Sequence, residues 1–251
     1  MSQKESKRQK HIEKRFQERE KALRKASEIF EQKVIPYFNK LNESLDIGTG
    51  SGYTAFTLAK HLKKVVSIDS EPKCLKIAEI QAARDKIKNI HFFQMDAHKL
   101  NFADESFDVV TCRAAIHHFD DSNKVLGEVR RVLKRGGFFV LMDFCFSEAT
   151  KDVLAPISRI REDDFRSYYT FHDYCDLLEN NGFSIEVIYT YTLPRVAQEW
   201  AAVAPENIQE RIINAFLNLD KRIHSELRFH KEGDQHIMLY RIVEIISKKW
   251  R

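Results

Sequence analysis

The sequence has 251 residues, of which 43% are hydrophobic and 31% are charged, and its formal net charge is +4 at pH 7. This length and composition exclude a disordered chain and are typical of one large globular domain, alone or with an added segment. The four cysteines lie far apart without a CxxC pair, which argues against a disulfide framework or a metal site. No apolar signal-type run or membrane-span-length segment is found, so the sequence predicts a cytoplasmic protein without a membrane span.

Positive charge is concentrated in residues 1–25, which contain ten Lys or Arg residues and four Glu residues. The remaining residues are slightly acidic overall, which disfavours nucleic acid as a partner. The basic segment is most simply the solvated face of a helix. Its apolar residues recur at helical spacing before Pro36; they are Ile12, Phe16, Leu23, Ala26, Phe30 and Val34. We therefore expect residues 1–40 to form a helical extension or lid, followed by the main domain over residues 41–251.

Short apolar runs alternate with segments of helical periodicity between residues 43 and 145. The expected strands are 43–47, 64–69, 90–95, 107–112 and 137–145, and the expected helices are 53–62, 72–85 and 121–133. This alternation predicts an α/β fold with a mainly parallel sheet. Later segments predict a helix at 171–180, strands at 184–190 and 237–246, and a helical block at 195–229. That block is longer than a connection requires, so we interpret it as a cap over the ligand edge of the sheet.

The segment LDIGTGSG, directly at the end of the first expected strand, contains Gly48, Gly50 and Gly52. In an open α/β sheet, ligands bind beyond the carboxyl ends of the strands, and glycines let the backbone approach them closely. The spacing differs from the GxGxxG pattern of dinucleotide sites, because Tyr53 occupies the position of the last glycine. Asp46 suits a cationic amino-acid group better than a pyrophosphate. The loop therefore predicts a nucleotide-like ligand that is not a dinucleotide.

Two further acids end the next two expected strands. Asp69 lies about 20 residues after the glycines, where an acceptor for ribose hydroxyls is expected, and Asp96 is placed to read an exocyclic amine. Either residue alone is more simply a helix cap or a turn residue. Three acids at the ends of three consecutive strands, on the edge that bears the glycine loop, predict one shared nucleoside site.

Five segments of the chain together resemble the successive motifs of class I S-adenosylmethionine-dependent methyltransferases, in particular their small-molecule, ubiquinone-methyltransferase-like branch. They are LDIGTGSG, VVSIDSEPKCLKIA, FFQMDAHKLNFADESFDVV, AAIHHFDD and VRRVLKRGGFFVLMD. The resemblance covers about residues 44–145. It implies S-adenosyl-L-methionine as the cofactor and a Rossmann-like sheet of seven strands whose last strand is antiparallel.

The resemblance also implies how the cofactor is held. The glycine loop lines the methionine and ribose part, with Asp46 near the methionyl ammonium through the loop. Asp69 takes the ribose hydroxyls, while Asp96 and the Ala97 backbone N–H read adenine. Arg113 pairs either with the methionyl carboxylate or with a surface acid. The full set of expected cofactor residues is Asp46, Gly48, Thr49, Gly50, Gly52, Asp69, Ser70, Asp96, Ala97 and Arg113.

Methyl transfer from a sulfonium depends mainly on alignment, since the leaving thioether takes no proton, and a base matters only for a hydroxyl, phenol or carbon acid acceptor. His117 and His118 follow the fourth expected strand and are candidate bases or, alternatively, packing residues. Phe165 stands where related sequences often carry a histidine. The candidate acceptor residues, each with an ordinary core or turn role as the alternative, are Asp143, Tyr168, Tyr169 and Trp200.

The sequence thus predicts a methyltransferase that acts on a small-molecule acceptor by in-line displacement under a helical cap. One alternative is an RNA- or protein-directed methyltransferase that uses the basic N-terminal segment. The tetrapeptide [DN]PP[YF], typical of base N-methylation, is replaced by CRAAI after the fourth strand, which disfavours a nucleic-acid base as the acceptor. The other alternative is a cofactor-binding regulator without turnover, which the intact acids and glycines disfavour.

Overall fold

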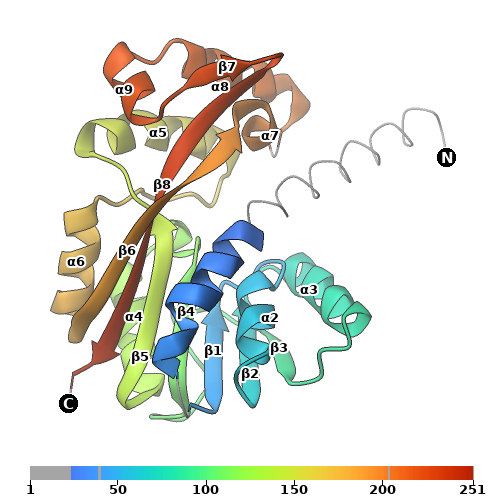
Figure 1. The fold of residues 1–251 in the computed structure, drawn as a ribbon, viewed down its shortest axis with the longest axis vertical. Helices are drawn as coiled ribbons and strands as arrows, with labels where there is room; N and C mark the ends of the chain where they lie inside the picture. Colours follow the sequence, from blue (N-terminus) through green and yellow to red (C-terminus); the bar gives the residue numbers. More distant parts are fainter. Residues whose placement is uncertain (1–23, 39–40, 203, 251) are drawn as a thin grey trace.

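The computed structural model describes residues 24–38, 41–202 and 204–250 of the chain (Figure 1). A sheet with helices on both faces forms the lower part of the view, and a helical cap stands above it. In the described part of the chain, none of the helices has the length and apolar character that a membrane span needs.

One mixed sheet organises the whole fold. Its strand order is β3-β2-β1-β4-β5-β8-β6, with the short β7 paired to β8. The strands are β1 (Glu43–Ile47), β2 (Lys64–Asp69), β3 (Ile90–Gln94), β4 (Phe107–Arg113), β5 (Leu133–Phe144), β6 (Phe183–Val196), β7 (His230–Glu232) and β8 (Gln235–Lys249). The first five pair in parallel, and β8 is antiparallel to both β5 and β6. The predicted mainly parallel sheet with an antiparallel last strand is confirmed, and β7 is an addition to it.

Helices cover the sheet because its central strands β1, β2 and β4 are buried on both faces, whereas the edge strand β3, which the sequence predicted to be buried in the same way, is largely exposed. On one face lie α4 (Ser122–Val132) and α6 (Phe171–Asn180), which share a core with the strands. The other face is covered by α2 (Tyr53–Ala59) and by residues 24–38, which are helical from 24 to 33 and end in the 3-10 turn η1 (Ile35–Phe38). Beside α2, the helix α3 (Pro72–Arg84) packs against β2 and β3.

The N-terminal prediction is tested only in part. Ala26, Phe30 and Val34 are buried in the core on the sheet face that residues 24–38 cover, at the helical spacing that the sequence showed. The other three residues of the predicted stripe, Ile12, Phe16 and Leu23, lie outside the described residues. For the described part, the segment is packed on the main domain.

The cap has a core of its own. It contains α5 (Glu148–Arg161), α7 (Ala197–Ala201), α8 (Glu206–Leu217) and α9 (Lys221–Glu226), and α5 packs on α8 and α9. Figure 1 shows β6 and β8 running upwards out of the sheet into this cap. Residues 195–196, expected to be helical, instead end β6, because their pairing with β8 continues to Val196 opposite Ile237. The sequence also missed α5, whose pattern is interrupted by Pro156.

Candidate functional site

The glycine loop between β1 and α2 requires glycine for its backbone. Gly48, Gly50 and Gly52 all have positive φ, at 64°, 54° and 88°. A Cβ on Gly48 would lie 2.5 Å from the Cβ of Ala115, and one on Gly52 would lie 2.5 Å from the ring of Phe56. A Cβ on Gly50 would meet nothing within 4 Å. The outer two glycines are therefore needed for packing and conformation, whereas the side of Gly50 is open to a ligand.

Asp46, in β1, stabilises this loop by hydrogen bonds. Its Oδ2 accepts a hydrogen bond from Thr49 Oγ1 and its Oδ1 accepts one from Thr111 Oγ1, both at 2.7 Å. The side chain is buried, and burial raises the pKa of Asp46 to about 6. Both oxygens thus serve the protein, so Asp46 can act on a ligand only through the loop. Thr111 is a residue that the sequence did not identify, and its only signal is its position near the end of β4.

Asp69, at the carboxyl end of β2, ties the loop to the neighbouring strand. Its Oδ2 accepts a hydrogen bond from the Gly50 backbone N–H at 2.8 Å, and its Oδ1 accepts one from the Glu71 N–H at 2.9 Å. An ionised carboxylate has about four acceptor positions, so these two bonds leave capacity for a ligand's hydroxyls. The structure brings Asp69 and the glycine loop together as the sequence predicted.

The remaining expected cofactor residues extend this edge. Ser70 is exposed, Ala97 is buried, and Asp96 is exposed on the loop after β3. The Asp96 carboxylate accepts hydrogen bonds from the backbone N–H and the ring Nδ1 of His98, which lower the pKa of Asp96. Asp96 is therefore an ionised, oriented acceptor. At the end of β4, Arg113 Nη1 donates to Ser27 Oγ at 3.3 Å, which joins this edge to the N-terminal segment.

The two candidate histidines differ sharply in environment. His117 lies in the 3-10 turn η2 (Ile116–His118) and is buried, with Nδ1 at 2.8 and 2.9 Å from the two Asp143 oxygens. Because an ionised carboxylate only accepts hydrogen bonds, the ring is assigned a proton on Nδ1, and its Nε2 is then the basic nitrogen. A base oriented by a carboxylate in this way is the arrangement found in many hydrolase triads.

Aromatic rings surround the His117–Asp143 pair. The ring centroids of Phe144, Phe165 and Tyr168 lie 5.4, 5.9 and 6.2 Å from that of His117. The Tyr168 hydroxyl is hydrogen-bonded to Ser158 Oγ at 2.8 Å, and burial raises the pKa of Tyr168 to about 12. Tyr168 is therefore one of the aromatic rings packed around His117 and is too weak an acid to take part in proton transfer near neutral pH.

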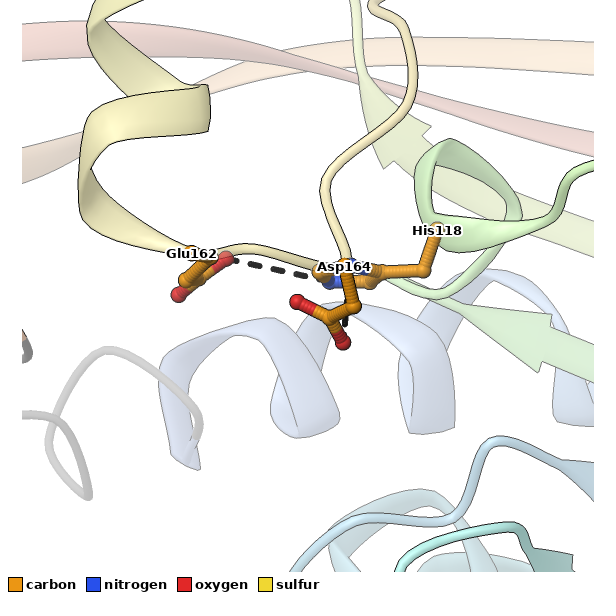
Figure 2. Close-up of side chains that lie close together, drawn as sticks. All are labelled: His118, Glu162 and Asp164. Atoms are coloured by element: carbon orange, nitrogen blue, oxygen red, sulfur yellow. Dashed lines mark ion pairs between the residues drawn. The ribbon is translucent and has the colours of Figure 1, made fainter.

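His118 faces two carboxylates on the loop after α5. Figure 2 shows Glu162 and Asp164 turned towards its ring, with Nε2 at 3.9 Å from Glu162 and Nδ1 at 3.4 Å from Asp164. Burial and the neighbouring His117 lower the pKa of His118, so the neutral ring is favoured near neutral pH. The three side chains have one ligand atom each within 4.8 Å of the others. Exposed acidic groups such as Asp164 are common without a bound ion, so we interpret this cluster as two carboxylates that face the His118 ring and not as an assigned metal site.

Two predicted acceptor residues lie away from His117. Tyr169 packs in the core beside α4 and α6, with its hydroxyl 2.9 Å from Ser122 Oγ. Trp200 is buried in the cap, where the Arg161 guanidinium stacks over its ring at 4.3 Å. The Arg161 side chain also pairs with Glu162 at 2.6 Å, so Arg161 links Trp200 to the His118 cluster. Asp143 and Tyr168 are thus gathered at one site, whereas Tyr169 and Trp200 are not.

The chain is similar to known methyltransferases in sequence and in fold. The model of a methyltransferase domain family matches residues 39–200. The uncharacterized methyltransferase YcgJ of Bacillus subtilis is 30% identical over 158 residues, which are 62% of either chain. A crystal structure of YcgJ superimposes with a TM-score of 0.80 and 24% identity, covering 88% of this chain and 98% of that one.

One further relative in sequence and one further solved structure are similar to this chain. A demethylmenaquinone methyltransferase of Thermotoga maritima is 41% identical over 102 residues, which are 39% of this chain and 42% of the relative. The structure of a geranyl diphosphate methyltransferase in complex with S-adenosylmethionine has a TM-score of 0.62 at 11% identity, covering 87% of this chain and 84% of that one. In sequence, the chain matches less than two thirds of the length of YcgJ and of the Thermotoga maritima methyltransferase.

Proposed function

Since the chain belongs to the methyltransferase domain family, we propose that it transfers the methyl group of S-adenosylmethionine to a small-molecule acceptor by in-line displacement. The observation that carries this proposal is that the glycine loop and the buried His117–Asp143 pair lie at the same edge of the sheet, at the ends of neighbouring strands. The relative named as a demethylmenaquinone methyltransferase supports a small molecule as the acceptor.

The residues at the glycine loop suit the cofactor. The open side of Gly50 lets the backbone approach the ligand, and the Asp69 carboxylate beside it retains acceptor capacity for ribose hydroxyls. Asp96 offers an acceptor for the adenine amine, and Arg113 offers a cation for the methionyl carboxylate. S-adenosylmethionine supplies an electrophilic methyl group on a sulfonium, which leaves as a neutral thioether.

The chain's own task is alignment and removal of one proton. We propose that His117 Nε2 removes the acceptor's proton, since Asp143 orients the ring through Nδ1 and stabilises the imidazolium that forms. The rings of Phe144, Phe165 and Tyr168 exclude water from this base. We therefore propose an acceptor that needs a base to become nucleophilic, such as a hydroxyl, a phenol or a carbon acid.

Calorimetry tests the cofactor first. S-adenosylmethionine and its demethylated product should bind with dissociation constants near micromolar, or about −8 kcal/mol, whereas NAD should not bind. The reason is that the loop lacks the third glycine of a dinucleotide site. Release of S-adenosylhomocysteine should then be measured with a panel of small phenols and quinols. Binding of NAD without binding of S-adenosylmethionine would overturn the assignment, and turnover on RNA alone would transfer it to a nucleic-acid acceptor.

We further propose that residues 24–38 and the helical part of the cap, at 197–229, close over the acceptor. Both segments adjoin the site: Ser27 contacts Arg113, and the cap reaches the His118 cluster through Arg161. Hydrogen exchange with and without S-adenosylhomocysteine should show added protection in both segments, beyond the loops at 46–52 and 69–71, because lid closure stabilises local structure. Equal exchange in both segments would make them a passive part of the core.

A further inference from the structure

A buried acid, Glu244, lies in the middle of β8 on the sheet face that residues 24–38 cover. Ile242 and Ile246, two positions before and after it, belong to the core on that face. Glu244 is 0% exposed, and neither of its carboxylate oxygens has a hydrogen-bond partner among the described residues. Burial of an unpaired carboxylate is costly unless a charge nearby compensates it or a proton neutralises it.

Strand register places Glu244 in one row with Arg113. Arg113 on β4 is paired with Met142 on β5, and Met142 is paired with Glu244 on β8. Directly paired residues point to the same face of a sheet, so Arg113 and Glu244 flank Met142 on one face. The same row continues to Gly48, one residue beyond the pair of Ile47 and Cys112. Glu244 is thus connected through Arg113 to the first glycine of the cofactor loop.

Arg113 is the cation on which the charge of Glu244 depends. Burial raises the pKa of Glu244 to about 7, and the positive charge of Arg113 opposes that rise. On its other side, Arg113 donates to Ser27 of the N-terminal segment. The α2 helix on this face has no charged residue. Other titratable or charged side chains on this face and its covering elements include Asp46, Glu31, Lys33, Tyr37, Lys60, His61, Tyr189, Tyr191, Arg195 and Lys248.

We propose that Glu244 is a positioning residue of the cofactor site, which takes up a proton when the carboxylate of the amino-acid part of the cofactor binds to Arg113. This rests on the function proposed above. Two carboxylates beside one guanidinium repel each other, and protonation of one of them removes that repulsion. One proton from the solvent becomes the O–H of Glu244, and no other covalent bond changes. Cofactor affinity is therefore linked to pH through a residue that does not touch the cofactor.

The expected signature is proton uptake on binding. With S-adenosylhomocysteine as the probe, the wild-type protein should take up as much as about one proton near neutral pH. Below about pH 7 Glu244 is already protonated, so the dissociation constant should be flat. Above it, the constant should rise by as much as about tenfold per pH unit. Calorimetry in phosphate and in Tris, between about pH 6 and about pH 8, measures both quantities because the two buffers differ in ionisation enthalpy.

Glu244→Gln keeps the shape of the side chain and removes its charge. This variant should bind the probe without proton uptake and with a dissociation constant that is nearly independent of pH in the same range. The matched control is Glu186→Gln, the same change at an exposed glutamate on β6, which should behave as wild type. A second control uses wild-type protein with 5′-methylthioadenosine, which lacks the amino-acid carboxylate and should therefore bind without proton uptake.

Three results would overturn the inference and leave the proposed function standing. They are an absence of proton uptake by the wild type, equal uptake by Glu244→Gln, and equal uptake with 5′-methylthioadenosine. The comparison of the two ligands uses wild-type protein only, so it tests the inference even if the variant fails to fold. Failure of S-adenosylhomocysteine to bind the wild type at any pH would instead overturn the cofactor site and this inference together.

Discussion

Replacing His117 by alanine is expected to lower turnover by about 10²- to 10⁴-fold while leaving the affinity for S-adenosylmethionine nearly unchanged. The loss follows from removal of the group that we assign as the base. Affinity should be retained because His117 lies in η2, beyond the end of β4, where its Nδ1 is bonded to Asp143 and not to a residue of the glycine loop. Single-turnover kinetics separate the chemical step from binding and product release.

The partner of His117 gives a sharper version of the same test. Asp143→Asn preserves the size of the side chain but removes its charge, so it no longer stabilises the imidazolium or fixes the ring proton on Nδ1. We expect a loss of turnover similar to that of His117→Ala, and a pH–rate profile that changes with it. The matched control is His172→Ala at an exposed position on α6, which should be neutral. Unchanged turnover in both His117 and Asp143 variants would mean catalysis by alignment alone.

Replacing Asp69 by alanine is expected to weaken cofactor binding by about 10²- to 10⁴-fold. The change removes two hydrogen bonds from ribose hydroxyls to a charged acceptor, at about 1.5–3 kcal/mol each. It also leaves the Gly50 N–H without the bond that ties the glycine loop to β2. Calorimetry with S-adenosylhomocysteine measures the effect, and thermal unfolding checks that the fold is intact.

The control for Asp69 is Asp85→Ala. Asp85 is an exposed aspartate at the end of α3, where it bonds the Gln81 side chain, so its loss should leave binding unchanged. Asp69→Asn keeps one carbonyl acceptor and should fall between the wild type and the alanine variant. An Asp69→Ala protein that binds the cofactor as tightly as wild type would contradict the assignment of the ribose to this residue.

The parallel half of the fold could be predicted from the sequence because strands buried on both faces appear as short apolar runs separated by helical periodicity. The glycine loop could also be predicted from the sequence, since positive φ and close packing leave few alternatives to glycine at Gly48 and Gly52. The prediction failed where local pattern and tertiary pairing disagree. The helix α5 was not predicted because Pro156 interrupts its pattern. The strand β6 extends into the expected helical block because it stays paired with β8.

The sequence could predict which residues lie at the strand ends of the site, but not which side chains pair there. His117 and His118 are adjacent in the sequence, and only the geometry of η2 shows that His117 meets Asp143 while His118 meets Glu162 and Asp164. The pairing depends on contacts between segments far apart in the chain. For Glu244 a signal did exist, because one acid interrupts the apolar run IVEII, but its connection to Arg113 depends on the register of three strands.

The long hairpin of β6 and β8 has a consequence for how acceptor specificity can be altered. These two strands remain paired from the body of the sheet up to Val196 and Ile237, and α7, α8, α9 and β7 are inserted between their upper ends. The insertion therefore leaves and rejoins the fold at a single junction, which is separate in the chain from the loops after β1, β2 and β3. A chimera that exchanges residues 197–234 with those of a relative should inherit a new acceptor preference while its affinity for S-adenosylhomocysteine stays that of the wild type.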